Sequence, residues 1–343
     1  MLASSSVANQ LSESRSETPE RLPSIPSAPV LAYVDASISS RKLIPHAMAV
    51  ASALGAPLTL LHVLDLPGRS DGPTDPVEWS IRRKEAHGRI RRMAREGRSR
   101  TLKPDVKIAE GRPVDQICRF ARELEAGIIV VGTKGDEDAA DWELGEVARQ
   151  LIDRSHGTLL LIPPSVDAVS DMRYGRILVP LDGSRTAESV LPLACRFARS
   201  AGAELLLAHI VPMPEMTEPG PLEAEDYELR HQVCERNERV ARRYIGQIRS
   251  RHACSGVAVR SAVISNGDVR SALARLVADE AVDLLVMSAH GRSCRPDVAF
   301  GSVAGYMITH ARTPLLLVKG SQVHQGNQLA GSQPGGLMRR PLQ

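Results

Sequence analysis

The sequence predicts an α/β fold made of two tandem doubly wound domains. Each domain is expected to hold a five-stranded parallel sheet, of strand order 3-2-1-4-5, with helices on both faces. Two observations support this expectation: short runs rich in Val, Ile and Leu alternate with helical stretches, and the whole pattern occurs twice in 343 residues. Strands that are apolar along their full length are typical of parallel sheets covered on both sides. A chain of this length can bury two separate cores.

An internal repeat relates the two halves. The stretch that begins at Val30 aligns with the one that begins at Ile177, and the stretch from residue 127 aligns without a gap to the one from residue 283. The matched pairs are Asp35 with Asp182, Gly55 with Gly202, His62 with His209, Gly135 with Gly291 and Gly145 with Gly301.

The second half shows the predicted elements in order. Its strands are residues 176–180, 204–211, 257–264, 282–287 and 313–319, and its helices are 186–202, 226–252, 268–281 and 303–311. The first half carries aligned counterparts, including a long helical stretch over 80–103. We expect the two long helices to bury narrow apolar stripes against the sheet. These stripes are Ala86, Ile90, Met93 and Ala94 in the first half and Leu229, Val233, Val240, Tyr244 and Ile248 in the second.

Composition places the domain boundaries. Both ends of the chain lack apolar periodicity, the first being rich in Ser, Pro and Glu and the last in Gly and Gln, so we expect disordered tails. A stretch rich in Pro, Ser and Asp divides the rest of the chain into two nearly equal parts. The expected parts are a tail over 1–28, a first domain over 29–164, a linker over 165–174, a second domain over 175–320 and a tail over 321–343.

Charge and cysteine content exclude several classes of function. The 43 basic and 40 acidic residues leave a net charge of +3. This nearly balanced charge does not indicate a nucleic-acid partner. The five cysteines form no CxxC pair, and the histidines lack metal-ligand spacing, so we expect no metal site. No apolar run is long enough to cross a membrane, and the start of the chain does not resemble a signal peptide, which together favour the cytoplasm.

The basic stretch 80–103 leaves three interpretations open. It can be the solvated face of a packed helix, a footprint for a polyanion, or a partner for the acidic stretch 136–143. Its lack of aromatic residues favours the solvated face over nucleic-acid binding.

A ligand is expected between the carboxyl ends of strands one and four of the second half. In sheets of this order, ligands bind where the strand order reverses. Asp182 ends the first strand, and residues 288–302 follow the fourth. Glycines there allow close backbone approach, the N-terminus of the following helix attracts anions, and Arg292 and Arg295 add positive charge. The plainer alternative is that Gly301 and Ser302 merely begin a helix.

These residues resemble the universal stress protein family. Its pattern is glycine, two residues, glycine, nine residues, glycine and Ser or Thr after strand four, with an Asp closing strand one; here Ser288 replaces the first glycine. The resemblance covers both halves and implies ATP, with Mg²⁺, at the switch point. It implies that Asp182 and Ile210 hold adenine while the loop and Ser302 take ribose and phosphates. The implied ligand-binding residues are Pro180, Asp182, Ile210, Ser288, His290, Gly291, Gly301, Ser302 and Val303.

The first half keeps the glycine spacing but changes the chemistry. Nine residues rich in Asp and Glu separate its last two glycines, and Glu146 stands where the second half has Ser302. Like charges close to a triphosphate repel it, and Tyr33 replaces Pro180. We therefore expect one working site and one degenerate domain. The weaker candidates there are Asp35, Val63, Gly132, Gly135 and Gly145.

The resemblance implies an ATP-binding protein of stress response and signalling. The alternative is an adaptor that binds no nucleotide and acts through protein partners. Signature motifs of enzymes are absent, so we name no catalytic residue and expect at most slow ATP hydrolysis or autophosphorylation. The last strands of both halves have apolar edges, and the resemblance implies pairing through them. The expected assembly is a homodimer or an intramolecular pseudo-dimer.

Overall fold

The computed structural model describes most of the two predicted domains. It covers residues 28–35, 37–64, 76–96, 102–134, 144–155, 157–166, 172–214, 223–253, 256–292 and 298–319. Residues 1–27 of the expected N-terminal tail, the expected C-terminal tail, the acidic stretch 136–143, Gly135 and Arg295 lie outside these residues.

Ten strands of the described chain form one continuous sheet, in the order β3-β2-β1-β4-β5-β10-β9-β6-β7-β8. Each half therefore has the predicted order 3-2-1-4-5, and its strands pair in parallel. The strands are β1 (Val30–Tyr33), β2 (Leu58–Leu64), β3 (Asp105–Glu110), β4 (Ile128–Gly132), β5 (Thr158–Ile162), β6 (Arg176–Pro180), β7 (Glu204–Pro212), β8 (Val259–Gly267), β9 (Leu284–Ser288) and β10 (Leu315–Val318).

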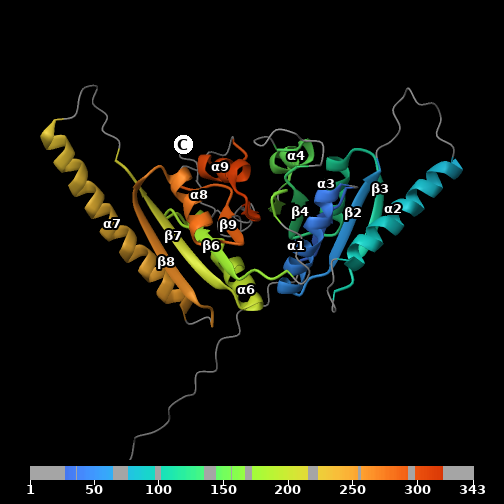
Figure 1. Cartoon of the computed structure of the whole chain (residues 1–343), viewed down its shortest axis with the longest axis horizontal. Helices are drawn as coiled ribbons and strands as arrows, with labels where there is room; N and C mark the ends of the chain where they lie inside the picture. Colours follow the sequence, from blue (N-terminus) through green and yellow to red (C-terminus); the bar gives the residue numbers. More distant parts are fainter. Residues whose placement is uncertain are drawn as a thin grey trace, which may run out of the picture.

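Helices connect the strands and cover both faces of the sheet (Figure 1). They are α1 (Ile38–Leu54), α2 (Pro76–Glu96), α3 (Pro113–Glu123), α4 (Glu146–Arg154), α5 (Arg185–Glu188), α6 (Leu191–Ala201), α7 (Ala224–Ala253), α8 (Val269–Asp279) and α9 (Ser302–His310). Among the described residues, none of these helices combines the length and the apolar composition needed to cross a membrane.

Alternating side chains of the strands enter two hydrophobic clusters. In β1, Val30 and Ala32 join the cluster that includes residues of α1, α2, α6 and α7, whereas Leu31 and Tyr33 join the one that includes residues of α3, α4, α8 and α9. This period of two is what an extended strand dictates. The doubly wound architecture predicted from the apolar runs is therefore confirmed.

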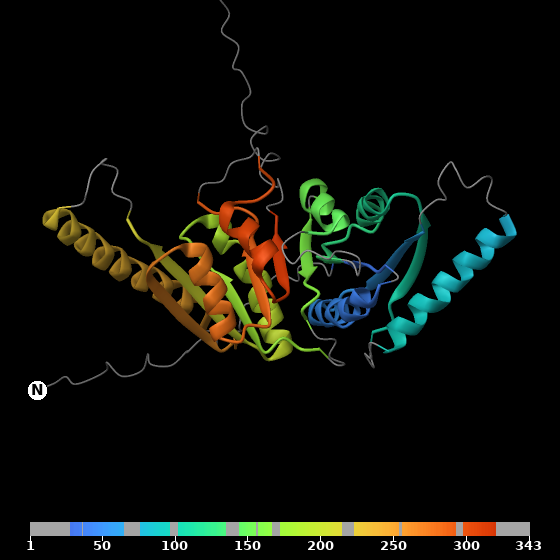
Figure 2. The ribbon, with the colours of Figure 1, turned by 45° about the horizontal axis from the view of Figure 1, so that its top comes forward.

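The two halves meet along an antiparallel seam in the middle of the sheet, and they lie side by side in Figure 2. Leu159, Leu160 and Leu161 of β5 pair with residues of β10, so the expected pairing of last strands occurs within one chain. Lys319, just after β10, donates from Nζ to the carbonyl oxygens of Ile152 and, at 2.8 Å, of Ser155, both at the end of α4.

A buried tyrosine joins the cores of the two halves. Tyr174, which precedes β6, is 2% exposed and its hydroxyl lies 3.0 Å from Nδ1 of His46 on α1. The main-chain N–H groups of Gly175 and Arg176 then donate to the Asp283 carboxylate, at 2.6 and 3.1 Å. The segment that leads into the second half is thereby fixed to both halves.

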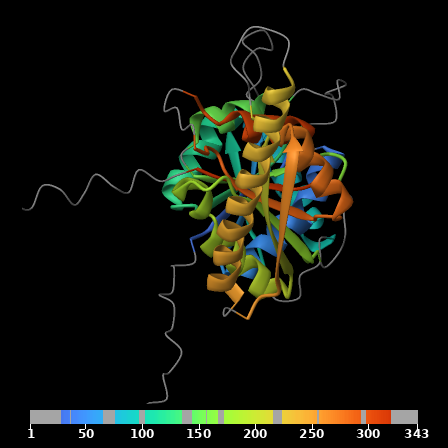
Figure 3. The same ribbon diagram turned by 90° about the vertical axis from the view of Figure 1, so that its left-hand side faces the viewer.

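Two details of the helices differ from the sequence prediction. The stretch 186–202 forms α5 and α6 rather than one helix, and Pro192 lies in the first turn of α6, where proline needs no N–H partner. In α7, the predicted stripe was wrong for Leu229 and Val240, which are 52% and 56% exposed. Figure 3 shows α7 lying across the sheet beside β8. The residues of α7 that are buried are Cys234, Ala241, Ile245 and Ile248.

Candidate functional site

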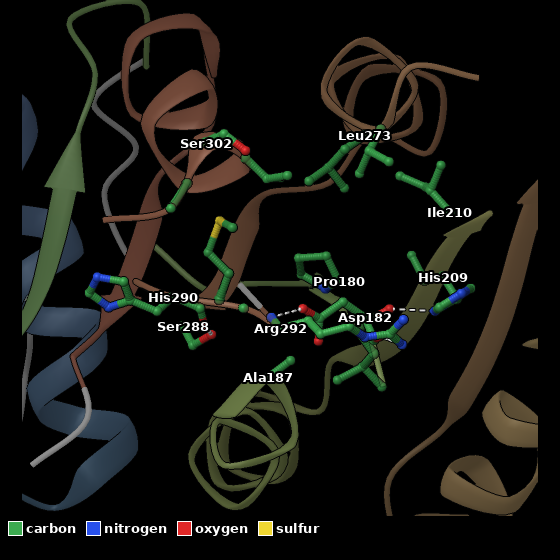
Figure 4. A pocket seen from close by; sticks show the side chains of 18 of the residues that line it. Pro180, Asp182, Ala187, His209, Ile210, Leu273, Ser288, His290, Arg292 and Ser302 are labelled. Atoms are coloured by element: carbon green, nitrogen blue, oxygen red, sulfur yellow. Dashed lines mark hydrogen bonds between the residues drawn. The ribbon is translucent and has the colours of Figure 1, made fainter. Parts of the chain in front are cut away.

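A cavity of about 380 Å³ opens at the carboxyl ends of β6 and β9, the place predicted from strand order (Figure 4). Its size is within the range of small-molecule sites. Residues from β6, β7, β9, α8 and α9 line it, so the fold brings together segments from positions 180 to 304. All nine second-half candidates are among its lining residues: Pro180, Asp182, Ile210, Ser288, His290, Gly291, Gly301, Ser302 and Val303.

Asp182 holds several donors at the end of β6. Its Oδ1 accepts from the N–H of Ser184 at 2.9 Å and from the Ser184 hydroxyl at 2.6 Å, and its Oδ2 accepts from the N–H of Arg292 at 2.6 Å. Burial alone would raise the pKa of Asp182, but these hydrogen bonds outweigh it and hold the pKa below its ordinary value. The carboxylate is therefore ionised at neutral pH.

The two glycines of the loop are required for different reasons. A Cβ at Gly291 would overlap Oδ2 of Asp182, so the protein itself demands glycine there. Gly301 has φ −75° and ψ 166°, which any residue adopts, and a Cβ would meet nothing nearer than the Ala289 carbonyl at 3.7 Å. The fold therefore tolerates a side chain at Gly301. The absence of a side chain at Gly301 leaves room beside the cavity.

Ser288 fits where the family pattern has a glycine. It ends β9, and its φ is not positive. The turn therefore needs no left-handed backbone at this position. Its hydroxyl donates to the carbonyl oxygen of His290 and closes the turn. The His290 ring in turn places Nε2 2.8 Å from the carbonyl oxygen of Val298, so the ring braces the far side of the loop.

The N-terminus of α9 faces the cavity without a side-chain cap. Gly301 occupies the N-cap position and makes no side-chain hydrogen bond, whereas α8 is capped by the carboxylate of Asp268. The first N–H groups of a helix have no partner within the helix. Ser302 and Val303 begin α9 and both line the cavity. The free N–H groups and the helix dipole together make this end of the cavity suited to an anion.

The opposite end of the cavity is apolar. Ile210 of β7 and Leu273 of α8 lie together there, away from Ser302 (Figure 4). Val269 of α8 adds to this lining and, like Leu273, was missed by the sequence analysis, because an apolar position on an amphipathic helix carries no sign of a ligand. An apolar slot beside an uncapped helix N-terminus is chemically suited to an apolar ring that carries an anionic group.

His209 and Arg292 complete the mouth of the cavity. Nδ1 of His209 lies 2.7 Å from the Leu181 carbonyl oxygen, and burial is the main cause that lowers the pKa of this imidazole. The neutral ring therefore donates to that carbonyl. Arg292 was considered only as a source of charge, yet its Nη2 donates to the carbonyl oxygen of Asp182 at 2.7 Å.

The first half repeats much of this framework. Oδ1 of Asp35 accepts from the N–H of Ser37 at 2.9 Å, as Asp182 does from Ser184. The ring of His62 lies 2.7 Å from the Val34 carbonyl oxygen, which matches His209 and Leu181. The N–H of Gly145 donates to the Thr133 carbonyl at 2.8 Å, as that of Gly301 does to Ala289.

The slot of the first half is built differently. Tyr33, at the position of Pro180, is 9% exposed and belongs to one hydrophobic cluster with Val63, Ile117 and Val131. These three are the counterparts of Ile210, Leu273 and Met287, which line the second-half cavity. A tyrosine ring therefore lies in the core where the second half has a small proline.

The helix N-terminus that follows the loop also differs between the halves. Glu146 begins α4, and its carboxylate accepts from Arg149 at 2.6 Å and from Gln150. A carboxylate at this position satisfies the helix dipole that an anionic ligand would otherwise use. Of the remaining first-half candidates, Gly132 ends β4, whereas Gly135 and the acidic stretch that follows it lie outside the described residues.

Comparisons with known proteins agree with this geometry. The universal stress protein family matches residues 27–163 and 173–319. A universal stress protein of Mycobacterium tuberculosis is 24% identical over 301 residues, covering 85% of this chain and 97% of that protein. A universal stress protein of Methanocaldococcus jannaschii is 24% identical over 159 residues, covering 43% of this chain and 95% of that protein. The crystal structure of a universal stress protein from Archaeoglobus fulgidus has a similar fold, with a TM-score of 0.60, 19% identity, and coverage of 86% of this chain and 99% of that one.

Proposed function

Because the chain belongs to the universal stress protein family, we propose that its second domain binds an adenine nucleotide and that this occupancy serves stress response and signalling. The ligand is ATP, accompanied by Mg²⁺. The proposal places the binding domain at residues 175–320, the degenerate domain at 29–164 with the linker between them, and the protein in the cytoplasm.

The observation that carries the proposal is the contrast between Gly291 and Gly301. Gly291 is explained by the protein alone, since a Cβ would overlap Asp182. Gly301 is not, because its backbone and surroundings accept a side chain. A glycine that the fold does not need, at an uncapped helix N-terminus beside a cavity, supports close approach of a ligand anion to the backbone.

The chain's own residues fit the two parts of the nucleotide. Ile210 and Leu273 offer apolar contact to a base, and the backbone of Gly301 with the hydroxyl of Ser302 offers donors to phosphates. The bound nucleotide would supply a polyphosphate that carries Mg²⁺. No catalytic group is assigned, and turnover is limited in this proposal to slow hydrolysis or autophosphorylation.

The alternative function is an adaptor that binds protein partners without a nucleotide. The observation that favours it is Tyr33, because in the first repeat a buried aromatic residue stands where the second repeat has the proline that lines the cavity. Under this alternative the second-half cavity is a remnant, and partner binding does not depend on ATP.

Calorimetric titration of the intact protein with ATP and Mg²⁺ tests the proposal. We expect one site for each chain, abolished by Gly301→Asp combined with Ser302→Ala, because the new carboxylate repels the phosphates. Gly145→Asp, the matched change before α4 of the first half, is expected to leave binding intact. Absence of binding in the intact protein would contradict the proposal, and the adaptor would take its place.

A further inference from the structure

We propose that Asp182 is a positioning residue that clasps the loop after β9 onto the end of β6, rather than the group that accepts a hydrogen bond from the base. The inference concerns the site of the proposed function and rests on that function for its ligand. The clasp itself is a property of the protein alone.

The hydrogen bonds of the carboxylate already engage both of its oxygens. Oδ1 accepts from the N–H and the hydroxyl of Ser184, and Oδ2 accepts from the N–H of Arg292. A carboxylate has about four acceptor positions. Three are therefore occupied by protein donors, two from Ser184, which caps α5, and one from Arg292 in the loop after β9.

Two hydrogen bonds run in opposite senses between the same two residues. The main-chain N–H of Arg292 donates to the Asp182 side chain at 2.6 Å, and the Arg292 side chain donates to the Asp182 main chain at 2.7 Å. Residues 110 positions apart are thereby joined at both main chain and side chain. Such reciprocal pairing fixes the loop more firmly than either bond alone.

Gly291 shows how closely the loop is held. Its backbone lies so near to Oδ2 of Asp182 that a Cβ would overlap this atom. The close approach leaves no space for a base atom between Gly291 and the carboxylate. Asp182 is also held in its ionised form, since hydrogen bonds from Ser184 and Arg292 outweigh the cost of burial and lower its pKa.

The clasp controls the part of the site that meets the ligand. The loop it holds leads from His290 and Gly291 to Gly301, where α9 begins. Opening the loop displaces these groups whatever the base. Loss of Asp182 should therefore weaken ATP and ITP, which lacks the 6-amino group of adenine, by the same factor. A residue that accepts a hydrogen bond from the 6-amino group would instead affect ATP alone.

Two variants break the clasp from opposite sides. Asp182→Ala removes the acceptor, whereas Gly291→Ala keeps the carboxylate and forces the loop away from it. Ser184→Ala is the local control, because it removes one donor to Oδ1 and leaves the bond to Arg292. Asp35→Ala is the matched control in the first half.

The first readout needs no nucleotide. Amide hydrogen exchange of Arg292 reports the bond between its N–H and Asp182 directly. We expect exchange about tenfold faster or more in Asp182→Ala and Gly291→Ala, the scale of a lost hydrogen bond to a charged group. Ser184→Ala and Asp35→Ala should stay close to the unmodified protein. Unchanged exchange in both clasp variants would overturn the inference.

The second readout is the ratio of ATP to ITP affinity, by calorimetry with Mg²⁺. Both affinities should fall about tenfold or more in the two clasp variants, with their ratio unchanged. If Asp182→Ala abolishes the preference for ATP over ITP while Gly291→Ala keeps it, Asp182 is a base-reading residue and the inference is wrong. If the unmodified protein binds neither nucleotide, the proposed function fails, and the exchange measurement still decides on the clasp.

Discussion

Acidification should destabilise this protein through one buried histidine at the junction of its halves. His46 of α1 is fully buried, its Nδ1 lies 3.0 Å from the hydroxyl of Tyr174, and within the described chain its Nε2 has no hydrogen-bond partner. Burial lowers the pKa of His46 from 6.5 to about 4. The folded protein therefore keeps the ring neutral at pH values where the unfolded chain takes up a proton.

The sign and size of the effect follow from this difference. Above pH 6.5 the ring is neutral in both states and His46 causes no loss of stability. As the pH falls from 6.5 to about 4, the unfolded state alone binds the proton, so the free energy of unfolding decreases. At about 1.36 kcal/mol for each pH unit, the loss approaches about 3 kcal/mol near pH 4. Below the folded-state pKa the loss no longer grows.

Urea denaturation of the unmodified protein and of His46→Gln, between pH 7.5 and 4, measures this term. Glutamine keeps a polar side chain near Tyr174 but does not titrate, so subtracting the two curves removes the contribution of other groups such as His209. We expect the advantage of the unmodified protein over His46→Gln to shrink by about 3 kcal/mol over this range. A difference between the two proteins that stays constant with pH would refute the reasoning.

Three further substitutions have expected outcomes. Gly301→Ala should leave the melting temperature unchanged, since the nearest atom lies 3.7 Å from the new Cβ, but should weaken ATP in calorimetry. Gly305→Ala should lower the free energy of unfolding by about 1–3 kcal/mol in urea denaturation, because its Cβ would lie 2.7 Å from the ring of Phe300. Lys319→Met should cost about 1–2 kcal/mol in the same assay, since it deprives the Ser155 carbonyl of a donor at 2.8 Å; unchanged stability would contradict the assigned contact between the halves.

The sequence was sufficient for the architecture, and the residues it singled out in the second half line a single cavity. The apolar runs alternating with helical stretches indicated a doubly wound sheet, the strand order came with that architecture, and an Asp and a glycine loop at two strand ends were enough to locate the cavity. Ser288 is accommodated in place of the first glycine because it ends β9 in extended backbone, without a positive φ. These predictions succeeded because they depend on local backbone preferences and on the period of the strands.

Side-chain contacts between segments far apart in the chain could not be predicted from the sequence. Nothing in the sequence indicates that Arg292 pairs with Asp182, or that Tyr174 inserts against His46, since each pair is more than 100 positions apart. The stripe of α7 was assigned wrongly at Val240 because a helix of 30 residues offers several overlapping apolar lines. The packing of α7 against β7 and β8 selects which line is buried.

The seam between β5 and β10 frees the two repeats to diverge. In a symmetric dimer of identical chains, every substitution is present twice, so a change that spoils one pocket spoils both. Here the strands that meet belong to different segments of one gene product, and a change such as tyrosine at position 33 is present once. Covalent linkage also keeps the pairing independent of protein concentration. One repeat can therefore specialise as a permanent docking partner while the other retains its chemistry.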